Sequence, residues 1–241
     1  MSREARLLPA NLDYEDIFYI IILIAMVSNE IVGLNIVLVM DNIDTSLFSQ
    51  YWFIRNNVIS PEEMQSSSVF VPGLTNIGTE DCQIIVTPQN IQFVVKTSDI
   101  NKSYDSIKKR FARMVDAMPM IPLKAIGLNI NWKVMDENKN IPEFSKECFY
   151  KEESAIYRLF QNKDARFGAY FSQNYDYCTR LKLDIKPVLA NTPQGDMEFL
   201  LAAFNYHRDL SRENRLNEVK DQIKKWSNVI QNSKKIACSL I

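Results

Sequence analysis

Strict alternation of apolar and polar residues in two segments constrains the fold of this chain most strongly. In residues 123–134 the positions of one face are Ile126, Leu128, Ile130, Trp132 and Val134, and glycine, asparagine and lysine stand between them. Residues 177–186 repeat the pattern, with Leu181, Leu183 and Ile185 on one face. Successive side chains of a strand point to opposite faces, so each segment predicts a strand with one buried face and one solvated face. Such strands are typical of antiparallel sheets.

Two other segments carry the 3.6-residue period of a helix. The first begins near Ser103, ends before Pro119, and has its apolar positions at Ile107, Phe111, Met114, Val115 and Met118. The second is a long C-terminal helix from about Arg212, with apolar positions at Leu216, Val219, Ile223, Trp226, Ile230 and Ala237. We expect both helices to pack on a sheet through these stripes.

The order of elements is the same in the two halves of the chain. Further strands are expected at residues 31–40, 69–77, 83–87, 91–96, 167–173 and 199–207, with helices at about 47–54 and 152–160. This order predicts an α+β fold made of two consecutive units of antiparallel sheet and helix. The equal order of elements indicates a tandem repeat, or it arose by chance in a two-layer α+β protein. We expect an N-terminal unit at 1–135, a polar linker at about 136–147 and a C-terminal unit at 148–241.

An apolar run at residues 17–27 bears on membrane association. Ser28, Asn29 and Glu30 separate it from a second apolar run at 31–40. The first run is too short to span a bilayer, and a span made from both would bury Glu30 in hydrocarbon. We therefore expect a cytoplasmic protein without a membrane partner.

The cysteines and the histidine narrow the chemistry. The cysteines are too widely spaced for a zinc ribbon or a small disulfide framework: Cys82, Cys148, Cys178 and Cys238. No glycine-rich nucleotide-binding, zinc-protease or nucleophile-elbow motif occurs. His207 is the one histidine, and Asp209 is placed to orient it if the strand continues. Asp184 and Lys186 share a strand face, but no second carboxylate is placed with them for a metal-dependent nuclease. The sequence therefore assigns no catalytic, cofactor-binding or metal-binding residue and no cofactor, and it favours a protein that is not an enzyme.

Residues 81–134 carry a resemblance to a known family. The strand pair Gln83-Ile-Ile-Val-Thr-Pro-Gln-Asn-Ile-Gln-Phe-Val-Val precedes a helix led by Tyr104 and the strand Leu123-Lys-Ala-Ile-Gly-Leu-Asn-Ile-Asn-Trp. This layout resembles sporadically distributed bacterial α+β proteins of unknown function, in which a strand of the pattern I-G-L-x-Y-x-N recurs. This chain has Ile130 and Trp132-Lys133 where that family tends to have an aromatic and a basic residue. The resemblance implies the fold of most of residues 31–241 and a bacterial origin, with a link to defence or mobile gene islands, but no activity.

Charge is divided along the chain although Lys and Arg (28) nearly balance Asp and Glu (29). Residues 1–63 contain three basic and nine acidic residues, whereas 101–115 and 219–235 each contain five basic residues and one acidic residue. Solvated helix faces account for such basic runs, and so does a surface for nucleic acid or an acidic partner. In the second case the contact residues are Lys108, Lys109, Arg110, Lys224 and Lys225.

These patterns favour a non-enzymatic interaction protein. We expect an accessory subunit or adaptor of a bacterial complex, linked to antiviral defence, with another protein subunit as its partner. The alternative is a nucleic-acid-binding protein that uses the basic helices around 102–115 and 219–235.

Overall fold

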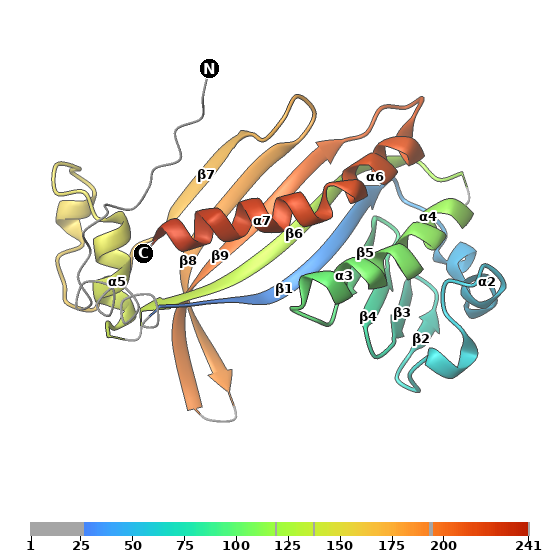
Figure 1. The fold of residues 1–241 in the computed structure, drawn as a ribbon, viewed down its shortest axis with the longest axis horizontal. Coiled ribbons are helices and arrows are strands. Elements are labelled where there is room, and N and C mark those ends of the chain that lie inside the picture. The colour runs from blue at the N-terminus through green and yellow to red at the C-terminus, as the bar shows by residue number, and fades with distance from the viewer. Residues whose placement is uncertain (1–26, 119, 137, 193–194, 241) are drawn as a thin grey trace, which may run out of the picture.

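Pairing between the two halves of the chain produces one large sheet. The computed structural model describes residues 27–118, 120–136, 138–192 and 195–240, so most of the apolar run at 17–27 lies outside the described residues. Nine strands of this part are antiparallel to their neighbours in the order β2-β3-β4-β5-β1-β6-β9-β8-β7. The central pair is β1 (Val27–Met40) and β6 (Leu123–Asp136), as Figure 1 shows.

Each half of the chain contributes one side of the sheet. The β1 side contains β2 (Val69–Val71), β3 (Leu74–Gly78), β4 (Cys82–Val86) and β5 (Asn90–Val95). The β6 side contains β7 (Ala169–Asn174), β8 (Arg180–Thr192) and β9 (Gly195–Asp209). Within each half the first strand pairs with the last one, β1 with β5 and β6 with β9. The predicted α+β class is confirmed.

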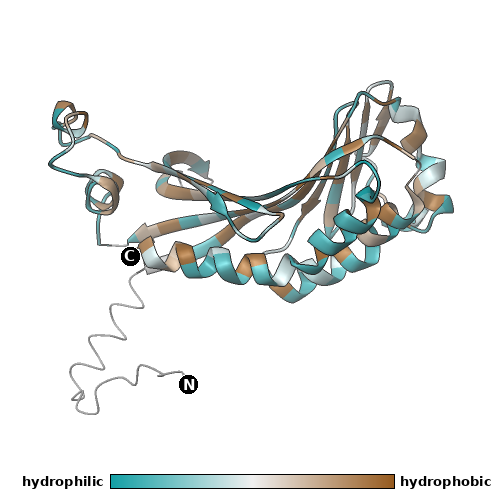
Figure 2. Cartoon of the chain, turned by 90° about the horizontal axis from the view of Figure 1, so that it is seen from above, coloured by the Kyte–Doolittle hydropathy of each residue, from teal (hydrophilic) through white to brown (hydrophobic). Residues whose placement is uncertain are grey.

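Helices cover one face of this sheet. Helix α3 (Ile100–Ser106) continues through a π-helical segment, Ile107–Phe111, into α4 (Ala112–Ala117). Helices α6 (Arg215–Lys224) and α7 (Trp226–Ala237) lie across β6. Figure 2 shows these four helices on the same side, along the outer side of the bend in the sheet. Every helix of the described residues is too short or too polar to span a lipid bilayer.

The core lies between the sheet and these helices. The even-numbered residues of β6 from 126 to 134 are buried, and Trp132 is only 3% exposed, which confirms the predicted inward face. The Trp132 Nε1–H donates to Ser233 Oγ of α7 at 2.9 Å, and the Trp226 Nε1–H of α7 donates to Ser103 Oγ of α3 at 3.1 Å. The two indole rings therefore join α7 to the strand beneath it and to the neighbouring helix.

The substitution Trp132→Phe tests this arrangement. We expect it to lower the free energy of unfolding by about 2 kcal/mol, because it leaves a small cavity and removes a buried hydrogen bond. Urea titration followed by circular dichroism measures the change. The control is Trp52→Phe in α2 (Gln50–Arg55), where the ring is only partly buried. An equal loss in both variants would contradict a special role for Trp132.

Two predicted elements differ in the structure. The strand predicted at 69–77 is two strands, β2 and β3, because Gly73 turns the chain between them with a positive φ of 83°. The helix predicted at about 152–160 is reduced to a 3-10 turn, Tyr157–Leu159, which buries no side chain. A short helix without a buried face gains little stability in water.

Two boundaries also need correction. The predicted linker at about 136–147 contains the start of helix α5 (Ile141–Phe149), whose cap is Asn140: its side chain accepts the Glu143 N–H at 3.0 Å. The predicted long C-terminal helix is divided at Lys225 into α6 and α7. The division into units 1–135 and 148–241 stays a prediction.

Candidate functional site

Arg110, one of the five basic residues predicted to contact nucleic acid or an acidic partner, is buried. It is 3% exposed, its Nε donates to Asp81 Oδ1 at 3.0 Å, and its two Nη atoms donate to Glu63 at 3.1 Å. Arg110 follows Ile107 by three residues and precedes Met114 by four, so helix geometry places it on the buried face. Its charge is used inside the protein.

The contacts of Arg110 set the charges of this cluster. Burial raises the pKa of Asp81, but bonds from Arg110 and Thr79 outweigh burial and lower it to about 2. Bonds from Arg110 and Lys109 hold the pKa of Glu63 well below its usual range. Burial also disfavours the charged guanidinium, but the two carboxylates outweigh it and raise the pKa of Arg110. All three groups are therefore charged at neutral pH.

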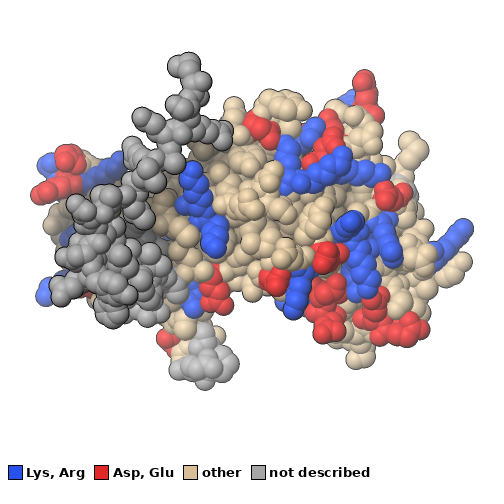
Figure 3. Space-filling view, in the orientation of Figure 1, with Lys and Arg blue, Asp and Glu red and all other residues tan. Residues whose placement is uncertain are grey.

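The other four predicted contact residues lie nearer the surface. Three of them already hold a carboxylate at 2.6 to 2.9 Å: Lys109 contacts Glu63, Lys224 contacts Asp221, and Lys225 contacts Asp176. Lys108 makes no ion pair with any residue that the structure describes. Figure 3 shows basic and acidic side chains intermixed on the helix-covered face. The structure therefore does not join these five residues into one basic patch.

The residues considered for catalysis make simple pairs. The His207 Nε2 lies 3.0 Å from Asp209 Oδ1, in the predicted arrangement, and Lys186 Nζ lies 3.2 Å from Asp184 Oδ2. Within the described ranges, no three His, Cys, Asp or Glu side chains are grouped to hold a metal ion. These contacts alone assign no reaction.

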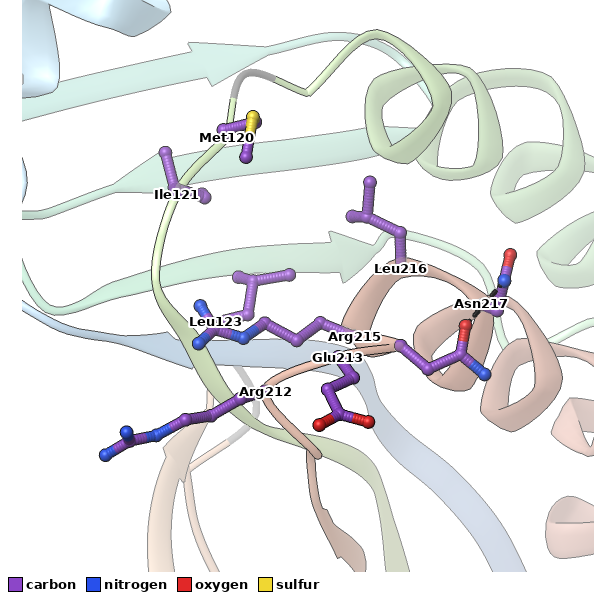
Figure 4. A pocket seen from close by; sticks show the side chains of 9 residues that line it. Met120, Ile121, Leu123, Arg212, Glu213, Arg215, Leu216 and Asn217 are labelled. Atoms are coloured by element: carbon purple, nitrogen blue, oxygen red, sulfur yellow. Dashed lines mark hydrogen bonds between the residues drawn. The ribbon is translucent and has the colours of Figure 1, made fainter.

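A hollow at the beginning of α6 is lined by Met120, Ile121, Leu123 and residues 212–217. Figure 4 shows the apolar side chains of Met120 and Leu216 on its walls, and the charged ends of Arg212 and Glu213 pointing away from them. Because its polar groups do not converge, we assign no ligand to this hollow.

Exposed apolar side chains occur in the segment after α5, at the end of the molecule where the C-terminus lies (Figure 1). Ile156, Leu159 and Phe160, here named the apolar knob, are 61%, 81% and 52% exposed. An aromatic contact between Tyr157 and Phe167, with ring centroids 5.6 Å apart, anchors the segment to the core. The sequence predicted only a helix at about 152–160 and did not single out these three residues, although they are spaced by three and four positions. The structure exposes them.

Strand β7 follows the apolar knob in the chain and forms an edge of the sheet. Among the described residues it pairs with β8 only, it contains no charged residue, and Tyr170 and Phe171 are 63% and 52% exposed. Edge strands offer unpaired backbone groups to other chains, and charges or proline usually protect them. A groove beside the edge is lined by six apolar residues, Phe171, Leu181, Leu183, Ile185, Ile236 and Leu240, and by three polar ones, Ser172, Gln173 and Ser239.

The apolar knob, β7 and its groove form the candidate site, a surface suited to another protein more than to water. No protein-family model matches this chain, and no curated protein is similar enough to it in sequence to count as a relative.

Proposed function

We propose that this protein is a non-enzymatic interaction protein, an accessory subunit or adaptor of a bacterial complex, and that its partner binds the apolar knob and β7. The observation that carries the proposal is the exposure of three apolar side chains at residues 156–160 together with the uncharged edge strand that follows them in the chain. A large apolar side chain gains about 1.5–3 kcal/mol when it is fully covered. A partner that pairs with β7 also forms main-chain hydrogen bonds.

The edge strand and the groove define the chemistry of the partner. β7 offers backbone groups along one edge, and the groove beside Phe171 accepts apolar side chains from the helix-covered side of the sheet. Because side chains alternate along a strand, the matching segment is extended, with apolar residues at every second position. It lacks charges where it faces Phe171, since an unpaired charge there would lose its hydration.

Finer features of the chain belong to the same proposal. We regard the chain as a tandem repeat of two α+β units, because β1 and β5 are paired in the first half as β6 and β9 are in the second. A cytoplasmic location is supported by four free cysteines, of which Cys82 is buried; this burial raises its pKa to about 11. The bacterial source and the link to defence depend on the resemblance of residues 81–134.

Nucleic-acid binding by the helices is the alternative function, and it has less support. Phosphate contacts need basic groups that are free to exchange counterions for phosphate. Arg110 is buried, and Lys109, Lys224 and Lys225 already contact acids.

Two substitutions test the proposed protein interface. Tagged wild-type protein is purified from its native host beside Leu159→Asp, Phe171→Asp and the control Val71→Asp, which changes an exposed residue on β2 at the other edge. We expect the wild type and the control to retain the same partner chain. The amount of partner retained by Leu159→Asp and by Phe171→Asp should be at least about tenfold lower, which corresponds to about 1.4 kcal/mol of binding energy.

Direct measurement completes this test. The partner chain is then purified and titrated against all four proteins by isothermal calorimetry, after their melting temperatures have been compared. Equal affinity for all four proteins, or a wild type that elutes from its host as a monomer without a partner, would contradict the proposal.

A further inference from the structure

The face of the sheet opposite helices α3, α4, α6 and α7 carries a straight row of asparagines. Asn35 of β1, Asn129 of β6 and Asn205 of β9 lie directly opposite one another in register. Asn129 Nδ2 donates to Asn35 Oδ1 at 2.6 Å, and Asn205 Nδ2 donates to Asn129 Oδ1. Each bond uses one of the two hydrogens of an amide, so the row retains donors and acceptors for a ligand.

Small residues keep this row accessible. A Cβ on Gly127 would lie 2.9 Å from Asn205 Nδ2. Glycine at this position of β6 therefore leaves the room that the side-chain amide of Asn205 occupies. Ala203, a small residue of β9, lines the same space. The result is a pocket lined by Asn35, Asn129, Asn131, Tyr170, Lys182, Asp184, Ala203, Phe204 and Asn205.

The row continues into a second pocket through Lys182. Lys182 of β8 is in register with Asn205, and Ser172 of β7 is in register with Lys182. With strands about 4.8 Å apart, the distance from Lys182 to Asn35 is about 14 Å. Lys182 and Arg180 also line a pocket at the turn between β7 and β8. The two pockets share Lys182, and we call them together the amide trough.

Two positively charged side chains of the amide trough, Arg180 and Lys182, have no carboxylate partner among the described residues. Four acids along it are paired with basic residues: Glu30 with Lys133, Asp184 with Lys186, Asp176 with Lys225 and Glu218 with Arg208. A fifth, Asp209, is 91% exposed and contacts the imidazole of His207. Among the described residues, Arg180 donates to neutral oxygens of Ser172 and Asn174, which orient its guanidinium, and neither Arg180 nor Lys182 makes an ion pair. Arg180 and Lys182 therefore place two positive charges two residues apart on one strand face, against one carboxylate, Asp209, that no described lysine or arginine contacts, and a net positive charge remains for an anionic ligand.

Two exposed tyrosines lie along the same trough. Tyr170 on β7 lines the amide pocket, and Tyr177 in the turn before β8 lines the other pocket and is 98% exposed. Exposed aromatic rings beside basic groups are the stacking platforms of single-strand binding proteins.

We infer that the amide trough binds single-stranded nucleic acid. Arg180 and Lys182 contact phosphates, Tyr170 and Tyr177 stack on bases, and the asparagine row donates and accepts hydrogen bonds at base edges. A duplex keeps its bases stacked on one another and cannot offer them to the tyrosines. The trough lies on the face away from the groove beside β7, so this inference goes beyond the proposed protein interface and does not depend on it.

Fluorescence anisotropy with a labelled DNA single strand of about 20 nucleotides tests the inference, at about 50 and about 200 mM salt. The variants are Arg180→Gln/Lys182→Gln and Tyr177→Ala, and the matched control is Lys108→Gln/Lys224→Gln on the helices. A duplex of the same length is the control ligand. Full-length proteins are compared, and their circular dichroism spectra show whether each variant is folded.

The charge variant should bind the single strand at least about tenfold more weakly than the wild type, because it loses two phosphate contacts. A plot of log affinity against log salt has a negative slope, and its steepness should decrease by about 1.4. This is twice the contribution of about 0.7 that one phosphate contact makes on a single strand. Tyr177→Ala should lose at least about fivefold, since stacking on one ring contributes about 1–3 kcal/mol.

Four results would overturn the inference. They are no binding of the single strand by the wild type at low salt, equal binding by the charge variant, binding of the duplex as tight as that of the single strand, and an equal loss in the helix control. The last result would assign the nucleic acid to the basic helices instead.

Discussion

A chain that ends at Ser211 should fail to give a folded monomer. The truncation removes α6 and α7, in which Val219, Trp226 and Ile230 are fully buried, and uncovers the apolar face of β6 beneath them. α3 also loses Trp226, its hydrogen-bonded neighbour. An exposed apolar surface of this extent causes aggregation. We expect an aggregated product, measured by size-exclusion chromatography and near-ultraviolet circular dichroism.

The control for the truncation is Lys234→Ala/Lys235→Ala, which changes exposed residues of α7 and should leave folding unaffected. The near-heptad spacing of the helix also permits a projecting oligomerisation helix. In that case the truncated chain would stay folded and monomeric, and our description of α7 as part of the core would be wrong.

The faces of the long strands were predictable because they depend on local alternation. Successive side chains of β6 point to opposite faces of the sheet, so the inward position of Trp132 follows from the alternation in the sequence. The pairing of β1 with β6 joins residues about 100 positions apart, and local patterns do not encode such a contact. The sequence therefore predicted two sheets where the strands form one.

The apolar knob and the amide trough were missed for different reasons. Ile156, Leu159 and Phe160 have helical spacing, but all three side chains are exposed, and the segment forms only a 3-10 turn that buries none of its residues. The asparagines at 129 and 131 were recognised as the polar face of a strand. The asparagine row also needs Asn35 and Asn205, which come from other strands. Only the register of the strands places these two residues beside Asn129.

Arg110 shows how long-range partners change the meaning of a residue. In the sequence it continues the basic pair Lys108-Lys109, which indicates a solvated face. In the structure Glu63 and Asp81, from distant segments, supply the charges that allow its burial. A buried arginine with two carboxylates is stable only when these bonds are satisfied.

We expect Arg110→Ala to lower the free energy of unfolding at pH 7 by about 3 kcal/mol. This is the lower end of the range for removing one partner of a buried ion pair, because Glu63 and Asp81 remain about one third exposed. Urea titration gives the value. The matched control is Lys109→Ala, which removes an exposed contact to the same Glu63 and should cost less than about 1 kcal/mol.

The pH dependence of that difference separates charge from packing. The folded-state pKa values of Glu63 and Asp81 lie below their unfolded values of about 4.5 and 3.8, and that of Asp81 is about 2. A lowered pKa contributes stability that is present above the unfolded value and lost as the pH falls through the folded one. The wild type should therefore lose its advantage over Arg110→Ala as the pH falls from about 4.5 toward 2. If the difference stayed constant over this range, Arg110 would stabilise the protein by packing alone, and the carboxylates would not be its partners in solution.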